Sequence, residues 1–145
     1  MRTVAAGGGS GETRGQVTTT DHPSLGVLLV DDSPSFLRAA KRLIETMPGF
    51  HLVGQAESGE QAIRMVEEQS PDLVLIDVRM PEMDGIEATV RICRQRPGTA
   101  VVLVSTIDEA DMPDRARDCG ALAYVAKQRL SAAAIAEFGE LAHPG

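Results

Sequence analysis

Acidic, hydroxyl and lysine side chains follow short apolar runs at four places in this sequence. Asp31 and Asp32 follow residues 27–30, Asp77 follows 73–76, Ser105 follows 100–104, and Lys127 follows 121–126. Asp77 is the clearest case, because a carboxylate at the end of so apolar a run needs a partner when it is buried. These five side chains are therefore the first candidates for chemistry.

Gathered in one place, the three aspartates would repel one another, and one would take up a proton unless a cation joined them. Lys127 supplies one positive charge, and a divalent metal would supply two more. The candidate ligands are hard oxygens with no Cys or His among them, which favours Mg²⁺. A carboxylate beside Mg²⁺ and a lysine has the surroundings of a nucleophile toward a phosphoryl group, which would give an aspartyl phosphate.

The apolar runs have the lengths of β-strands, and helical patterns separate them. Residues 27–30, 73–76 and 100–104 are apolar throughout, as buried strands of a parallel sheet are. Residues 50–56 alternate between apolar and polar side chains, which is typical of an edge strand. Residues 121–126 complete a set of five strands.

Capping residues and apolar periodicity predict a helix after each strand. Ser33 and Pro34 suit the N-cap and the first position of a helix over 34–47. Ser58 and Gln61 form a capping-box pattern for a helix that ends near residue 69. One further helix is expected to begin at Asp84 or Gly85 and to end before Pro97. A short helix is expected to end at Gly120, and a last helix to begin near Ser131.

Strands that alternate with helices form a parallel sheet with helices on both faces. We therefore expect an α/β fold of the flavodoxin-like, doubly wound (βα)5 type, with a parallel five-stranded sheet in the order 2-1-3-4-5. In such a sheet functional residues gather at the carboxyl ends of the strands, so the candidates above share one rim. Residues 25–143 form this domain, and residues 1–24, rich in Gly, Thr and Ser, are expected to form a flexible tail.

The composition is that of one ordinary globular domain, and it argues against several classes of function. A net charge of −7 argues against direct binding to nucleic acid, which needs a basic face. No apolar stretch approaches the ~20 residues that span a bilayer, and the N-terminus lacks the apolar region of a secretory signal. Cys93 and Cys119 fit no metal-ligand spacing, and we interpret them as reduced thiols of a cytoplasmic protein.

Four stretches of the sequence together resemble the receiver domain of bacterial two-component response regulators. They are "VLLVDDSP", "PDLVLIDVRMPEMDG", "VVLVS" and "AYVAK", and the resemblance covers residues 26–142. The form "DVRMPEMDG" is similar to receivers of the subgroup that often carries a helix-turn-helix output domain. The resemblance implies a phosphorelay signalling module that is not an enzyme but assists its own phosphorylation and dephosphorylation.

The resemblance also implies a role for each acidic and basic candidate. Asp77 matches the residue that accepts the phosphoryl group, and Lys127 matches the lysine that pairs with that group. Asp32 and Asp77, with the backbone carbonyl of Arg79, match the Mg²⁺ ligands. Asp31 matches the second member of the acidic pair, which often acts on the metal through water.

Two further residues match the switching parts of such receivers. Ser105 matches the hydroxyl that swings toward the phosphoryl group, and Tyr124 matches the aromatic residue that changes rotamer on activation. The surface over residues 111–142 would then be the output face, through which a homodimer could also form. The donor would be a histidine kinase, because none of the three histidines of the chain lies on the predicted rim.

Three positions depart from the family's pattern. Gln128 stands where the family often has a proline after the lysine. Pro113 falls inside the expected fourth helix, so we expect that helix to begin late, near Asp111 or Met112. Arg79 lies at a position that tunes phosphate lifetime in the family, and the lifetime stays open, as do the cognate kinase, the signal, the output target and whether the chain stands alone.

Two other interpretations stay open. The first is a receiver-like interaction module that phosphorylation does not regulate, for which the departures at Pro113 and Gln128 leave room. The second is a Mg²⁺-dependent phosphohydrolase of the haloacid-dehalogenase type, which also uses an aspartyl phosphate. That family resembles D-x-D after its first strand, whereas here Ser33 lies two residues after Asp31 and the candidate nucleophile follows the third strand.

Overall fold

The sheet is built entirely from parallel strands, as the alternation of strands and helices predicted. The computed structural model describes residues 2–3 and 24–143, and the strand order is β1-β6-β5-β4-β2-β3. Apart from β1, this order is the predicted 2-1-3-4-5. The strands are β1 (Arg2–Thr3), β2 (Leu25–Val30), β3 (Phe50–Ala56), β4 (Leu73–Asp77), β5 (Ala100–Ser105) and β6 (Ala123–Ala126).

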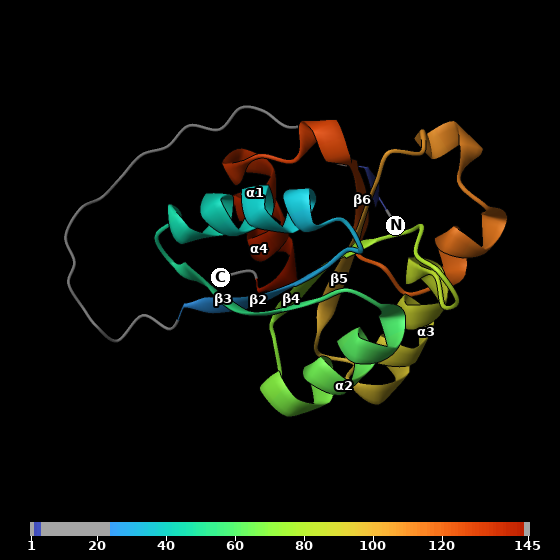
Figure 1. Ribbon diagram of the computed structural model, residues 1–145, viewed down its shortest axis with the longest axis horizontal. Coiled ribbons are helices and arrows are strands. Elements are labelled where there is room, and N and C mark those ends of the chain that lie inside the picture. The colour runs from blue at the N-terminus through green and yellow to red at the C-terminus, as the bar shows by residue number, and fades with distance from the viewer. Residues whose placement is uncertain (1, 4–23, 144–145) are drawn as a thin grey trace.

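In the part of the chain that the structure describes, four α-helices cover the two faces of the sheet, with α1 and α4 on one face and α2 and α3 on the other (Figure 1). No helix in the described residues is long and apolar enough to cross a membrane. Three short 3₁₀ helices complete the fold. The helices are α1 (Pro34–Glu45), α2 (Gly59–Gln69), α3 (Gly85–Gln95), α4 (Ala132–Ala142), η1 (Glu109–Asp111), η2 (Asp114–Asp118) and η3 (Lys127–Arg129).

Each face of the sheet has its own apolar core. Val27 and Leu29 of β2 point toward α1 and α4, and Leu28 and Val30 point toward α2 and α3. The central strands β2, β4 and β5 are buried almost throughout, which explains their unbroken apolar runs. The predicted edge strand over 50–56 is β3, and it does lie at the edge of the sheet.

Capping residues begin the four α-helices, and the predicted caps Ser33 and Ser58 are among them. Ser33, Ser58, Asp84 and Ser131 are N-caps, and each side chain accepts a hydrogen bond from the backbone N–H three residues later. The side-chain oxygen of Gln61 accepts a hydrogen bond from the backbone N–H of Glu57. In a standard capping box it would accept from the backbone N–H of the N-cap residue, Ser58. Local sequence therefore fixes the residue at which each of these helices begins.

The expected fourth α-helix is absent from the described residues, and this prediction was wrong. The segment between β5 and β6 forms the two 3₁₀ helices η1 and η2, with Met112 and Pro113 extended between them. Proline has no N–H and excludes a helical conformation from the residue before it, so Pro113 separates the two turns. The Pro113 carbonyl instead accepts a 2.9 Å hydrogen bond from Ala116 N, which is the short i to i+3 pattern of η2.

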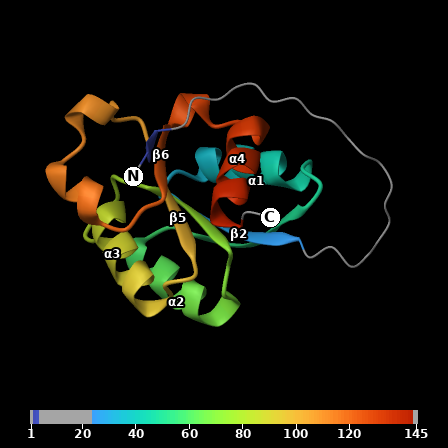
Figure 2. The ribbon, with the colours of Figure 1, turned by 180° about the vertical axis from the view of Figure 1, so that it is seen from behind.

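A sixth strand, which no sequence pattern indicated, extends the sheet beyond β6. Arg2 and Thr3 form β1 and pair in parallel with Ala123 and Tyr124, and Figures 1 and 2 show this segment beside β6. The outer edge of β6 offers backbone groups that a second strand can pair with. Residues 4–23 lie outside the described residues, so the flexible tail over 1–24 stays a prediction.

Candidate functional site

Three aspartates converge at the carboxyl ends of β2 and β4. These strands are neighbours, with Val30 paired to Ile76, so the residues that follow them lie side by side. Asp31 and Asp77 are buried and Asp32 is exposed. One carboxylate oxygen from each of the three lies within 4.8 Å of the others. The strand register therefore gathers the predicted acidic cluster.

Lys127 reaches this cluster from the end of β6. Its Nζ lies 2.8 Å from Asp31 Oδ2 and 3.8 Å from Asp77 Oδ2. Asp31 Oδ2 is buried and forms this ion pair, and no hydrogen-bond partner is found for it among the described residues. The other oxygen of Asp31 accepts a bond from Ser33 N at 2.9 Å. Asp31 thus has one oxygen held by the backbone and one buried oxygen that faces the ammonium group.

The surroundings of Asp77 disfavour its charged form. The pKa of Asp77 is raised from 3.8 to about 6, mainly because the carboxyl is buried and next because of the negative charge of Asp31. Lys127 and a hydrogen bond from the Arg79 backbone lower this pKa, and Asp32 adds a smaller repulsion. Near neutral pH Asp77 is still mostly ionised, because its raised pKa remains below 7.

Ser105 and Tyr124 link the rim to the segment over residues 106–120. Ser105 is buried at the end of β5, and its hydroxyl accepts a 3.1 Å hydrogen bond from Ile107 N. Tyr124 is buried in β6, and its hydroxyl donates to the Ile107 carbonyl. Both predicted switch residues therefore contact Ile107 at the start of this segment.

The loop after Asp77 is fixed to the start of α3 by close backbone contacts. Gly85 N donates to Val78 O at 2.8 Å. A Cβ at Gly85 would lie 2.0 Å from the backbone oxygen of Asp77, which no residue with a side chain can accommodate without movement. Arg79 lies in this loop, and the predicted role of its carbonyl in metal binding stays a prediction.

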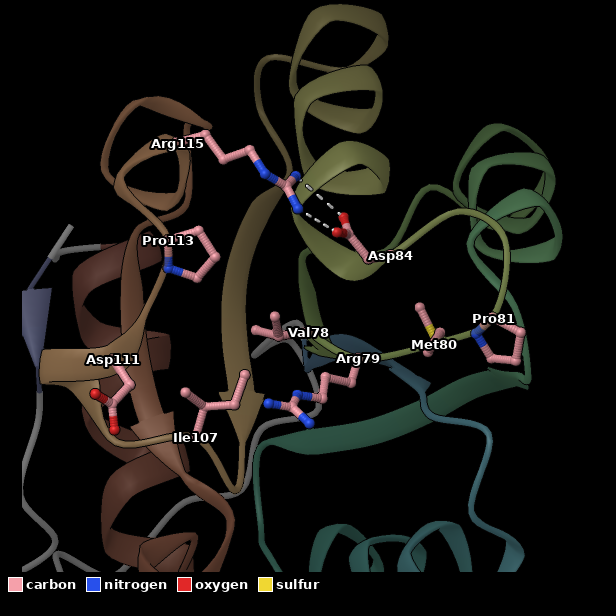
Figure 3. A pocket seen from close by; sticks show the side chains of 9 residues that line it. All are labelled: Val78, Arg79, Met80, Pro81, Asp84, Ile107, Asp111, Pro113 and Arg115. Atoms are coloured by element: carbon pink, nitrogen blue, oxygen red, sulfur yellow. Dashed lines mark hydrogen bonds and ion pairs between the residues drawn. The ribbon is translucent and has the colours of Figure 1, made fainter.

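An ion pair that the sequence did not indicate joins this loop to η2. Arg115 donates to the two carboxylate oxygens of Asp84 at 2.5 and 3.4 Å (Figure 3). Burial raises the pKa of Asp84, but hydrogen bonds from Arg115 and the Glu87 backbone outweigh it, so the pKa is lowered. The pair closes one side of a pocket of about 500 Å³, which Val78, Arg79, Met80, Pro81, Asp84, Ile107, Asp111, Pro113 and Arg115 line.

Sequence reasoning also missed an aromatic contact at the rim. The helical periodicity assigned Phe36 only to the apolar face of the helix over 34–47. Its ring also lies under Lys127, with Nζ 4.6 Å from the ring centroid. The available signal was an aromatic residue in the first helical turn after Asp31 and Asp32. The sequence does not show that Lys127 lies beside this ring, so the contact could not be predicted.

The comparisons with known proteins agree on one family. The family model described as response regulator receiver domain matches residues 27–137. The response regulator GacA of Pseudomonas viridiflava is 39% identical over 101 residues, which cover 70% of this chain and 47% of that protein. The transcriptional regulatory protein DegU of Brevibacillus brevis is 31% identical over 124 residues, which cover 81% of this chain and 52% of that protein.

A solved structure gives the same picture. The signal receiver domain of the putative response regulator NarL from Mycobacterium tuberculosis is 26% identical, with a TM-score of 0.77 over 85% of this chain and 99% of that chain. This chain spans about half the length of GacA and DegU. The chain therefore belongs to the response regulator receiver domain family of two-component signal transduction.

Proposed function

We propose that Asp77 accepts a phosphoryl group from a histidine kinase in a Mg²⁺-dependent reaction. The observation that carries this proposal is the cluster of Asp31, Asp32 and Asp77 beside Lys127 at one rim of the sheet. The described histidines support an external donor, because both lie away from this rim. His143 is near Asp72, before β4, and His51 is in the first half of β3, bonded to Ser24.

The acidic cluster fits a hard divalent cation. Its oxygens are close enough to share one ion, and Asp31 Oδ2 is buried without a hydrogen-bond partner among the described residues. Asp31, Asp32 and Asp77 would hold Mg²⁺, with the backbone carbonyl of Arg79 as a further ligand. When bound, the ion supplies positive charge that offsets both the carboxylates and the oxygens of an incoming phosphoryl group.

The chain's own residues then divide the work of phosphoryl transfer. A carboxylate oxygen of Asp77 forms the new O–P bond, while the P–N bond to the kinase imidazole breaks and the imidazole leaves with the electron pair. Lys127 is close enough to Asp77 to pair with the transferred group's oxygens. Near neutral pH Asp77 is mostly ionised, because its pKa is about 6, and the nucleophile is therefore available.

Phosphorylation would be transmitted through Ser105. A Ser105 hydroxyl that turns to the phosphoryl oxygens gives up its present hydrogen bond with Ile107 N. Tyr124 bonds to the carbonyl of the same residue, so its rotamer is coupled to that change. The segment over 106–120 would move, and with it the output surface over 111–142, through which partners or a second copy would bind.

The chain itself would be a phosphoacceptor in the cytoplasm rather than an enzyme with its own substrate. Its relatives differ in what accompanies this domain. One relative, a protein-glutamate methylesterase/protein-glutamine glutaminase of Geobacter sulfurreducens, is 39% identical over 101 residues, only 27% of its length. GacA and DegU are about twice as long as the matched region, and we propose that the output of this protein likewise depends on a region or partner beyond the receiver.

Intact mass after incubation with acetyl phosphate tests the proposal. We expect a gain of one phosphoryl group that requires Mg²⁺ and disappears in Asp77→Asn, because the nucleophilic oxygen is lost. Asp108→Asn is a matched control, since this exposed carboxylate lies outside the acidic cluster. No gain with either acetyl phosphate or a panel of histidine kinases would instead favour an interaction module that phosphorylation does not regulate.

A further inference from the structure

Two acids and one aromatic ring lie beside the ammonium group of Lys127. Asp31 and Asp77 lie at 2.8 and 3.8 Å, and the ring centroid of Phe36 lies 4.6 Å from the same nitrogen. A lysine within about 6 Å of a ring centroid, over its face, is attracted by the electron density of that face. The ring thus forms one wall of the site that holds the ammonium.

Local sequence fixes the ring at this place. Ser33 caps α1, Pro34 opens it, and the Ser33 hydroxyl accepts a 3.3 Å hydrogen bond from Phe36 N. The following residue Leu37 is buried in the core, so Phe36 lies half-buried at the border between that core and the rim. The cap that begins the helix therefore also orients the ring toward the polar site.

Aromatic residues are few in this chain, which has three phenylalanines, one tyrosine and no tryptophan. Phe50 lies against the position of Gly139, and Tyr124 is bonded to Ile107. Phe138 is fully buried in the core between α1, α4 and the sheet. Among the described residues Phe36 is thus the one aromatic side chain that contacts a charged group of the rim.

A purely structural role for Phe36 would need only an apolar side chain of similar size. A leucine would meet that need, but it offers no electron-rich face to the ammonium. The lysine side chain is long and flexible, and its ion pairs with Asp31 and Asp77 lie on the acidic side of the ammonium group only. The ring therefore restricts where the ammonium can lie in a way that the acids alone do not.

We propose that Phe36 is a positioning residue that holds the Lys127 ammonium in place for phosphoryl transfer to Asp77. The expected effect on the rate of phosphorylation rests on the proposed function. The contact between Phe36 and Lys127 is independent of that function. Phe36 acts through Lys127 and does not touch the transferred group. The expected contribution is small, because cation–π contacts at partly exposed sites are worth about a twofold to fivefold change in an equilibrium or a rate.

The test compares Phe36→Leu and Phe36→Tyr with the wild type. Proton NMR of the Lys127 ε-methylene reports the contact directly, because a ring face moves nearby protons upfield. We expect this upfield shift to be lost in Phe36→Leu and kept in Phe36→Tyr. An ε-methylene shift that Phe36→Leu leaves unchanged would overturn the proposal, whether or not the protein is phosphorylated.

A second experiment measures the rate of phosphorylation by acetyl phosphate at saturating Mg²⁺. The acetyl phosphate concentration is varied, so that the maximal rate and the half-saturating concentration are obtained separately. We expect the maximal rate to fall about twofold to fivefold in Phe36→Leu, to recover in Phe36→Tyr, and to stay unchanged in Phe50→Leu. Equal rates in Phe36→Leu and the wild type, or equal losses in both Phe36 variants, would overturn the proposal. A wild type that takes up no phosphoryl group from acetyl phosphate or from a panel of histidine kinases would instead count against the proposed function, and the NMR experiment would still decide the contact.

Discussion

The two segments on either side of the acidic rim are held in different ways. The loop over 78–85 is fixed by backbone contacts: Gly85 N bonds to Val78 O, and the Gly85 Cα leaves no room for a side chain beside Asp77 O. The segment over 106–120 contains two short 3₁₀ helices, and only Ala116 and Cys119 of this segment are buried. Polar contacts of Tyr124 and Arg115 hold that segment to the domain.

The two sides of the rim therefore differ in how easily they can move. Close backbone packing leaves a segment one arrangement, because any displacement causes overlap or opens a void. A segment with few buried apolar contacts opens at a smaller cost in free energy than the core does. The acceptor side is therefore rigid, and the 106–120 side is the one that a new contact to Ser105 can displace.

The largest effect is expected from Gly85→Ala. The added Cβ would lie 2.0 Å from Asp77 O, so the loop or α3 must shift, and we expect a loss of about 3 kcal/mol in the free energy of unfolding. Gly98→Ala is the matched control, because a Cβ there meets nothing within 4 Å and the change should stay within about 0.5 kcal/mol. Equal urea midpoints for the two variants would contradict the view of a rigid acceptor loop.

Asp77→Asn should stabilise the rigid side of the rim. The folded-state pKa of Asp77, about 6, exceeds the ordinary 3.8, so the stability that this carboxyl contributes is present below pH 4 and is lost as pH rises through 6. The neutral amide avoids that loss. In metal-free buffer we expect Asp77→Asn to be more stable than the wild type by about 2 kcal/mol at pH 7.5.

The gain from Asp77→Asn should shrink as the pH falls toward 3.8 and disappear below it, where the wild-type carboxyl becomes protonated in both the folded and the unfolded state. Urea unfolding at several pH values with a chelator present measures this directly. A gain that does not depend on pH would show that the amide acts through new hydrogen bonds and not through the removal of a buried charge.

The smallest effect is expected from Arg115→Gln on the looser side. The Arg115 side chain is 55% exposed and that of Asp84 is 28% exposed, so the ion pair contributes less than about 1 kcal/mol. We expect little change in global unfolding but about twofold to fivefold faster hydrogen exchange at Ala116 N and Cys119 N. The effect should shrink in high salt, and Arg117→Gln, in the same 3₁₀ helix but without an ion pair in the described residues, should show none.

Most of the fold followed from the sequence because local signals and burial agreed. The runs over 73–76 and 100–104 are each within one residue of the observed strands, and Ser33 and Ser58 cap the helices that they were predicted to cap. Parallel strands bring their carboxyl ends together, so Asp31, Asp77 and Lys127 could be grouped without a structure. These predictions depend only on periodicity and on the geometry of the sheet.

The parts that sequence reasoning missed depend on contacts between distant segments. Pro113 was recognised as a break, but whether a shortened α-helix or 3₁₀ turns would follow depends on what the segment packs against. Arg115 and Asp84 are far apart in the chain, and nothing local marks them as partners. The ring of Phe36 had an adequate explanation in the apolar face of α1, so its second contact with Lys127 gave no signal.

The buried Tyr124 has a practical consequence for spectroscopy. It is the single tyrosine of a sequence without tryptophan, so the near-ultraviolet circular dichroism and the intrinsic fluorescence of the protein come mainly from one ring. That ring is anchored by its hydroxyl to the Ile107 carbonyl. The unlabelled protein therefore carries an optical reporter at the point where the 106–120 segment leaves the sheet.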